Sequence, residues 1–142
     1  MTALQETGPS VPSSDKSTVR VAVVFGGRSG EHTISCATAA GVLSAIDRDR
    51  YEVLPVGITP EGQWLLVEDD PAALELSDNR PPVTITAEGL GRGRLSAPLG
   101  GGELTVLGPT GPEVLGQVDV VLPLLHGPYG EDGTIQGMLE MM

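Results

Sequence analysis

A run of almost entirely apolar, mostly β-branched residues at 19–25 (VRVAVVF) constrains the fold most. Such a run is typical of a strand buried on both faces in a parallel sheet. The glycine-rich turn GGRSG follows it, then a stretch with apolar residues at helical spacing (31–46), then a second apolar run (53–58). Strand, turn, helix and strand in this order form a βαβ unit, which is right-handed in nearly all proteins.

A second strand–loop–helix sequence lies near the end of the chain. Residues 118–125 (VDVVLPLL) read as another buried strand, and a helix is expected from residue 134, with Ile135, Met138, Leu139 and Met142 on one face. Together the two units predict an α/β fold with a mainly parallel open sheet flanked by helices.

The segment between these units is harder to interpret. Residues 63–67 (QWLLV) should return as a hairpin strand after a Pro–Glu–Gly turn. Residues 68–116 are rich in Gly and Pro, and we expect an insertion of small strands there, with candidates at 83–86 and 104–107.

Composition narrows the class of protein. The chain has 142 residues, enough for one domain at 19–142 after a polar tail at 1–18 that we expect to be flexible. A net charge of −11 argues against nucleic acid and anionic membranes as partners. We expect no membrane span or signal peptide, and the lone Cys36 allows no internal disulfide. These features together predict a cytoplasmic protein.

Two polar loops follow the buried strands, at residues 26–32 (GGRSGEH) and 126–133 (HGPYGEDG). Ligands of open parallel sheets bind beyond the carboxyl ends of the strands, so both loops should open on one crevice. The candidate site residues are Glu31, Ser35, His126 and Glu131. The glycine spacing of the first loop does not fit a dinucleotide-binding turn, and no phosphate-binding loop is present.

Each candidate also has a structural explanation. Glu31 could merely complement the N-terminus of a helix, and Ser35 could be an ordinary helix hydroxyl. His126 could be a packing imidazole. His32 is expected at the surface or at the helix start, and Asp132 suits the N-cap of the second helix.

The two loops with their flanking strands resemble the D-alanine–D-alanine ligase family. The similarity lies in VAVVFGGRSGEHTIS (21–35), LPLLHGPYGEDGTIQGMLE (122–140) and VGITPEGQW (56–64). The resemblance implies the N-terminal domain that precedes an ATP-grasp fold. It further implies that Glu31 recognises the ammonium of the first D-alanine, that Ser35 supports Glu31, and that His126 and Glu131 line the substrate pocket. Glu31 and His126 would be the catalytic residues.

The resemblance also implies features outside this chain. The family uses ATP and Mg²⁺ for peptidoglycan synthesis, and the residues that bind them would lie beyond Met142, so this chain alone is expected to be inactive. The resemblance implies a homodimer that is joined partly through this domain. Two alternatives stay open: a non-catalytic binding or dimerisation module, and a fragment of a D-alanyl-D-lactate ligase.

Overall fold

A computed structural model describes residues 18–96 and 103–142 of the chain. Residues 1–17 of the expected tail, and residues 97–102, lie outside the described residues. The described elements are, in chain order, β1 Val19–Gly26, α1 His32–Ala45, β2 Tyr51–Ile58, β3 Trp64–Val67, α2 Pro71–Leu74, β4 Gly91–Ser96, β5 Glu103–Gly108, β6 Gly111–Gln117, β7 Val120–Pro123 and α3 Thr134–Met141.

The predicted parallel strands form one half of the sheet. β1 lies between β2 and β7 and pairs in parallel with both, with Val23 opposite Pro55 on one side and Leu122 on the other. The helix expected at 31–46 is α1, which connects β1 to β2. The βαβ unit predicted from the first apolar run is therefore confirmed.

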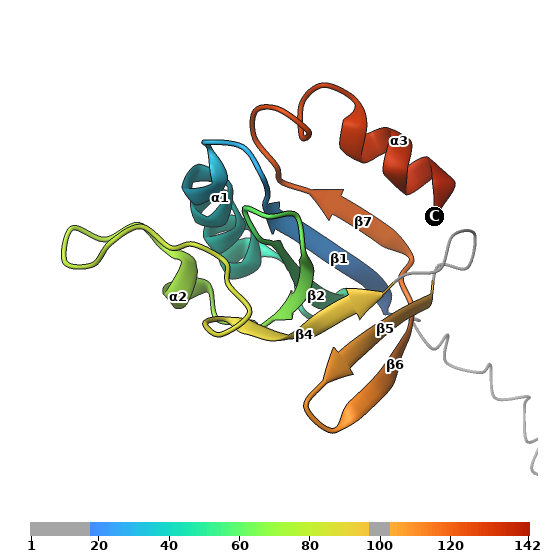
Figure 1. The fold of residues 1–142 in the computed structure, drawn as a ribbon. Coiled ribbons are helices and arrows are strands. Elements are labelled where there is room, and N and C mark those ends of the chain that lie inside the picture. The colour runs from blue at the N-terminus through green and yellow to red at the C-terminus, as the bar shows by residue number, and fades with distance from the viewer. Residues whose placement is uncertain (1–17, 97–102) are drawn as a thin grey trace, which may run out of the picture.

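The other half of the sheet is antiparallel. The strand order is β6-β5-β4-β3-β2-β1-β7, and every pairing from β2 to β6 is antiparallel. The hairpin strand at 63–67 and the strand at 104–107 are confirmed as β3 and β5. The α/β class and the open sheet flanked by helices are confirmed, and parallel pairing is confined to β2, β1 and β7 (Figure 1).

Three features of the middle segment differ from expectation. β4 (GRGRLS) and β6 (GPEVLGQ) belong to the expected insertion of small strands, but their positions were not predicted, because glycine and charged or proline residues interrupt their patterns. The short helix α2 was not expected. Residues 83–86 are not a strand, and the N–H of their buried residue Ile85 donates to the His32 ring and not to a neighbouring strand.

Helices α1 and α2 pack on one face of the sheet and are drawn to the left of the strands in Figure 1. Small side chains on α1 let the helix approach the sheet closely, and each large apolar side chain buried in this layer contributes about 1.5–3 kcal/mol. The layer contains Val21, Val23, Phe25, Cys36, Ala39, Ala40, Leu43 and Leu74. A second cluster, formed by Ala22, Val24, Val56 and Ile58, lies on the opposite face of the same strands.

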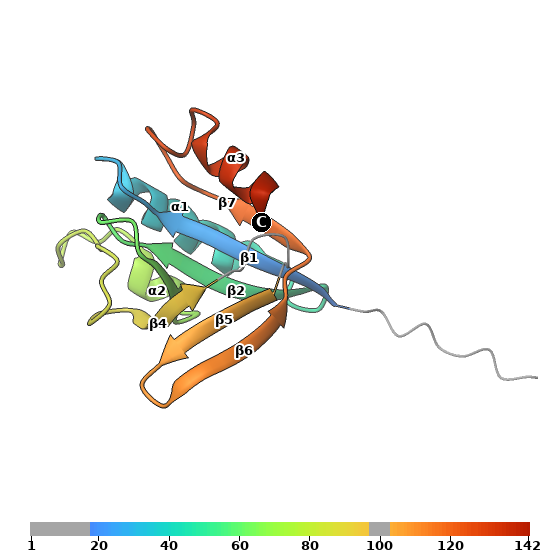
Figure 2. The same ribbon diagram turned by 45° about the vertical axis from the view of Figure 1, so that its right-hand side comes forward.

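Strand β7 is less buried than its sequence suggested. The expectation of burial on both faces is wrong, since Val120 is 47% and Leu122 is 37% exposed. β7 is an edge strand that pairs only with β1, so its outer side lacks a neighbouring strand among the described residues. α3 lies beside β7 in both ribbon views (Figure 1 and Figure 2). Ile135 is the one buried residue of this helix. No helix in the described part of the chain is long and apolar enough to cross a membrane.

Candidate functional site

The two polar loops leave the sheet at the same edge. β1 and β7 are parallel neighbours, and the Leu124 N–H donates to the Val24 carbonyl oxygen at 2.7 Å. In Figure 1 the loops that follow β1 and β7 project together beyond the strands. The expectation that residues 26–32 and 126–133 share one edge is confirmed.

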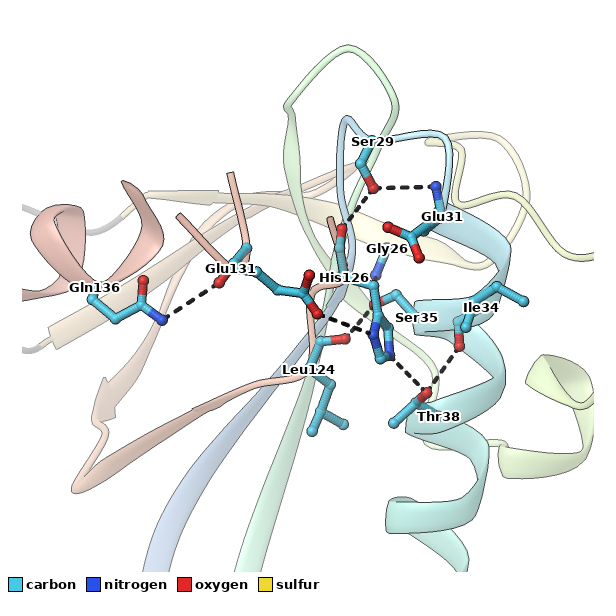
Figure 3. A network of polar contacts seen from close by, with 11 residues as sticks. Gly26, Ser29, Glu31, Ile34, Ser35, Thr38, Leu124, His126, Glu131 and Gln136 are labelled. Carbon is cyan, nitrogen blue, oxygen red and sulfur yellow. Dashed lines mark hydrogen bonds and ion pairs between the residues drawn. The ribbon is translucent and has the colours of Figure 1, made fainter. Parts of the chain in front are cut away.

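Ser29 connects the two loops, and sequence analysis missed it. Its hydroxyl donates to the His126 carbonyl oxygen at 2.7 Å and accepts from the Glu31 N–H at 3.2 Å (Figure 3). One side chain thus fixes the backbone of Glu31 relative to His126. A serine two residues before a glutamate is an ordinary turn pattern, so the sequence gives no signal for this bridge.

The carboxylate of Glu31 lies against the second loop. Glu31 is the N-cap of α1, but its exposed side chain makes no capping hydrogen bond. A Cβ placed on Gly127 would clash with Glu31 Oε2, and the φ of Gly127 is +70°, so both space and backbone favour glycine there. The result is an accessible negative charge near the helix N-terminus and beside the backbone of the His126 loop.

Ser35 is buried beneath the site. Its side chain is 0% exposed, and its hydroxyl donates to the Leu124 carbonyl oxygen at 2.7 Å and accepts from the Gly26 N–H at 2.9 Å. The expectation that Ser35 faces a crevice is therefore wrong. The hydroxyl joins the ends of β1 and β7 to α1, because these two backbone groups need partners where the strands stop pairing.

His126 is oriented from both sides of its ring. Nε2 lies 3.0 Å from Thr38 Oγ1, and the Thr38 hydroxyl donates to the Ile34 carbonyl oxygen at 3.0 Å (Figure 3). Since that hydroxyl has one proton, it accepts from His126, which places a proton on Nε2. Nδ1 faces Glu131 Oε1 at 3.8 Å. Thr38 was missed, although Glu31, Ser35 and Thr38 follow the spacing of one helix face.

The loop that carries Glu131 is held by its own backbone and by Asp132. The Glu131 N–H donates to the Gly127 carbonyl oxygen at 2.9 Å, and the Asp132 carboxylate accepts from the Tyr129 and Thr134 N–H groups. A hydrogen bond from the Thr134 hydroxyl, followed by those from the two N–H groups, lowers the pKa of Asp132. The N-cap of α3 is Gly133 and not Asp132 as expected, although Asp132 still bonds the first N–H of the helix.

Tyr129 forms a second contact between the loops. Its φ of 71° is the one positive value for a non-glycine residue in the described segments, and such a conformation is strained. The guanidinium carbon of Arg28 lies 5.2 Å from the centroid of its ring. Arg28 and Tyr129 thus join the outer ends of the loops through a cation–π contact.

Other polar and aromatic side chains near the two strands are packing groups. Cys36 is buried in α1, and burial raises the pKa of its thiol to about 12. Tyr51 and Trp64 are partly buried and pack against the two apolar clusters. His32 is the first residue of α1, so the expected position at the helix start is confirmed, but it is only 6% exposed and does not lie at the surface.

A shallow hollow of about 270 Å³ lies elsewhere, on the antiparallel half of the sheet. It is lined mainly by apolar and glycine residues together with Arg92 and Arg94, and it contains none of the predicted site residues. The convergence of polar groups therefore occurs at the carboxyl edge of β1 and β7 and not in this hollow.

Comparisons with known proteins identify the family. A family model described as the D-ala D-ala ligase N-terminus matches residues 20–142, so the chain belongs to this family. The D-alanine–D-alanine ligase of Mycobacterium avium (strain 104) is 54% identical over 123 residues, which is 87% of this chain and 33% of that protein. The chain spans about a third of the length of the curated relatives it matches.

Solved structures agree with this assignment. The VanG D-Ala:D-Ser ligase of Enterococcus faecalis matches with a TM-score of 0.70 and 27% identity, over 87% of this chain and 34% of that chain. The D-alanine–D-alanine ligase of Coxiella burnetii matches with a TM-score of 0.66 and 28% identity, over 87% and 33%. The resemblance noted in the two loops thus extends to the whole described fold.

Proposed function

We propose that the full-length protein is an ATP-dependent ligase that joins two D-alanines, and that this chain supplies the site for the first D-alanine. The observation that carries the proposal is the contact of the Glu31 carboxylate with the Gly127 backbone, because it brings the two family loops into one site. In the proposed reaction, ATP phosphorylates the carboxylate of one D-alanine, and the amine of the second displaces phosphate to form the amide bond.

Each site residue has a role consistent with its surroundings. The exposed carboxylate of Glu31 can accept hydrogen bonds from the ammonium of the first D-alanine. His126 donates from Nε2 to Thr38, which leaves Nδ1, on the side of Glu131, to form a hydrogen bond with the substrate. Ser35 supports Glu31 indirectly, since it anchors the start of both loops.

Residues 18–96 and 103–142 do not form a site for the cofactor metal. The described segments contain no group of three or more His, Cys, Asp or Glu side chains that could hold a metal ion. We propose that the ATP and Mg²⁺ that the family implies are bound by residues outside this chain, so that the chain alone does not turn over. The proposed dipeptide would serve peptidoglycan synthesis in the cytoplasm.

Glu31→Gln in the full-length protein tests the proposal. The substitution keeps the shape and removes the charge, so we expect kcat/KM for D-alanine to fall about ten- to hundredfold, since losing a charged hydrogen bond costs about 1.5–3 kcal/mol. The KM for ATP should be unchanged. Stability should fall by less than about 1 kcal/mol, because only a charge near a helix terminus is lost.

Glu113→Gln is the matched control. Glu113 is an exposed glutamate on β6, the edge strand of the antiparallel half, away from the two loops. Its substitution changes the net charge equally and should leave kinetics at the wild-type level. A Glu31→Gln variant with wild-type kcat/KM for D-alanine would refute the assignment and leave Glu31 as a helix-start charge.

Two other functions are separable by experiment. A ligase that makes D-alanyl-D-lactate would consume D-lactate in an assay that supplies ATP, D-alanine and D-lactate, and the D-serine specificity in the name of the Enterococcus protein recommends D-serine as a third arm. A non-catalytic binding or dimerisation module would have an intact mass near 14.7 kDa in its source organism. The homodimer that the family resemblance implies is testable by ultracentrifugation of the full-length protein.

A further inference from the structure

His32 makes two buried hydrogen bonds that connect the glycine turn to the middle of the chain. Its Nδ1 lies 2.7 Å from the Gly27 carbonyl oxygen, and the Ile85 N–H donates to its Nε2 at 3.0 Å. The ring is 6% exposed, and Ile85 is fully buried. Both ring nitrogens of an almost inaccessible histidine are therefore engaged by backbone groups.

These partners determine the protonation of the ring. A carbonyl oxygen only accepts a hydrogen bond, and an amide N–H only donates one. The proton must therefore be on Nδ1, and Nε2 must present a lone pair. His32 is a neutral Nδ1–H tautomer, because a second proton on Nε2 would point at the Ile85 N–H.

The Gly27 carbonyl is the point at which this ring can influence the site. Gly26 and Gly27 both have positive φ, at 86° and 96°, so the turn uses a conformation that depends on glycine. The Gly27 N–H is held by the Ile58 carbonyl oxygen at 2.8 Å, and the His32 ring packs so closely on Gly26 that a Cβ there would lie 2.9 Å from Cε1. His32 thus fixes the peptide from which the chain runs through Ser29 to Glu31.

We propose that His32, as the neutral Nδ1–H tautomer, is a positioning residue for Glu31. It acts through the Gly27 carbonyl and makes no contact with substrate. The bond to Gly27 orients the loop, whereas the bond to Ile85 attaches the ring to the core and satisfies a buried donor. The inference rests on the proposed function, because the purpose of positioning Glu31 is to bind the first D-alanine.

Two variants of the full-length enzyme separate the two bonds. His32→Asn places an amide nitrogen near the position of Nδ1, so it can retain the donation to Gly27 and loses the acceptor for Ile85. His32→Gln can present its amide oxygen near the position of Nε2, so it can retain the Ile85 bond and loses the Gly27 bond. We expect both to lower thermal stability, since each leaves one buried backbone group without a partner.

The kinetic expectation differs between the variants. The KM for D-alanine should rise about three- to tenfold in His32→Gln and stay within about twofold of wild type in His32→Asn, the size expected for one neutral hydrogen bond. The kcat and the KM for ATP should change little in either. Val106→Ala, a core substitution in β5, is the stability control and should leave the KM for D-alanine unchanged.

Equal rises in KM in both histidine variants, or a KM that follows stability across all three, would overturn the positioning role. Nitrogen-15 NMR of the imidazole in the same full-length protein provides a readout apart from activity: Nδ1 protonated is expected, and an Nε2–H signal would also overturn the proposal. A wild-type enzyme that ligates no D-alanine would overturn the proposed function itself, a result seen before any variant is compared.

Discussion

The parallel and antiparallel halves of the sheet differ in where their connections go. In the parallel half, the loops after β1 and β7 lead into α1 and α3 from the same edge, and they bring Glu31, His126 and Glu131 together. In the antiparallel half, consecutive strands reverse direction, as at the β5–β6 hairpin that closes at Gly108 and Gly111. Its turns therefore alternate between edges and cannot converge in this way.

This contrast explains why a hollow in the surface is a poor guide to the site. The hollow on the antiparallel half has volume, but its Arg92 already pairs with Glu68 at 2.7 Å. At the carboxyl edge of β1 and β7, in contrast, Ser29, Ser35 and Thr38 each hold a backbone group or a side chain of the site in a fixed position. The candidate site residues thus gather where two parallel strands end at one edge of the sheet, and not where the surface is hollow.

The largest expected difference between the halves is in serine substitutions. Ser35→Ala should lower the free energy of unfolding by about 2–4 kcal/mol, because the Gly26 N–H and the Leu124 carbonyl lose a buried partner. Ser96→Ala, on an exposed position of β4, should change it by less than about 0.5 kcal/mol. Urea unfolding measures both variants. Equal losses of unfolding free energy would contradict the role assigned to the buried hydrogen bonds of Ser35.

Glycine substitutions give the next largest contrast. Gly127→Ala and Gly111→Ala both place a side chain on a residue with positive φ, at a cost of about 1–2 kcal/mol in each half. At Gly111 a Cβ has nothing within 4 Å, whereas at Gly127 it clashes with Glu31 Oε2. Only Gly127→Ala should also reduce kcat/KM for D-alanine, by about tenfold or more. Similar kinetics in the two variants would show that the carboxylate tolerates displacement.

Alkaline pH should weaken the parallel half through Cys36, the one cysteine of the sequence. Burial raises the pKa of its thiol from 9.0 to about 12. Between these values the unfolded chain loses the proton and the folded chain keeps it, so stability falls as pH rises above about 9 and does not depend on this group below that. By pH 10 the fall should be about 1 kcal/mol. The free energy of unfolding should be measured at pH 8 and pH 10 for the wild type and for Cys36→Ala. The fall between these pH values should be smaller in Cys36→Ala than in the wild type, by about 1 kcal/mol.

The smallest expected effect concerns the cation–π contact between the loops. A double-mutant cycle of Arg28→Gln and Tyr129→Leu should give a coupling energy of about 0.5–1 kcal/mol. The Arg50–Tyr51 contact has a similar geometry at 5.6 Å, but it lies at the start of β2, at the sheet edge opposite to the two loops. Arg50→Gln should therefore leave the KM for D-alanine unchanged, whereas the Arg28 and Tyr129 variants should raise it modestly. Additive effects of Arg28→Gln and Tyr129→Leu would remove this link between the loops.

The sequence alone determined the parts of the fold that depend on local patterning. The apolar runs of β1 and β2, the helical spacing of α1 and the hairpin strand β3 were all predicted, because hydrophobic periodicity is a property of consecutive residues. The shared edge of the two loops followed from the direction of parallel strands. The family resemblance rested on the same two loops with their flanking strands and on residues 56–64, all of which the family model includes.

Only the tertiary structure decided what the neighbours of each side chain are. β4 and β6 form because adjacent strands supply hydrogen-bond partners for their backbones, although the residues of the two strands do not indicate a strand. Ser35 was expected to face the substrate and is buried instead, because its partner at Leu124 lies 89 residues away. Likewise His32 is defined by Ile85, 53 residues away. A polar side chain satisfies its hydrogen bonds with whatever group the fold brings near, and that group is not encoded in the residues beside it.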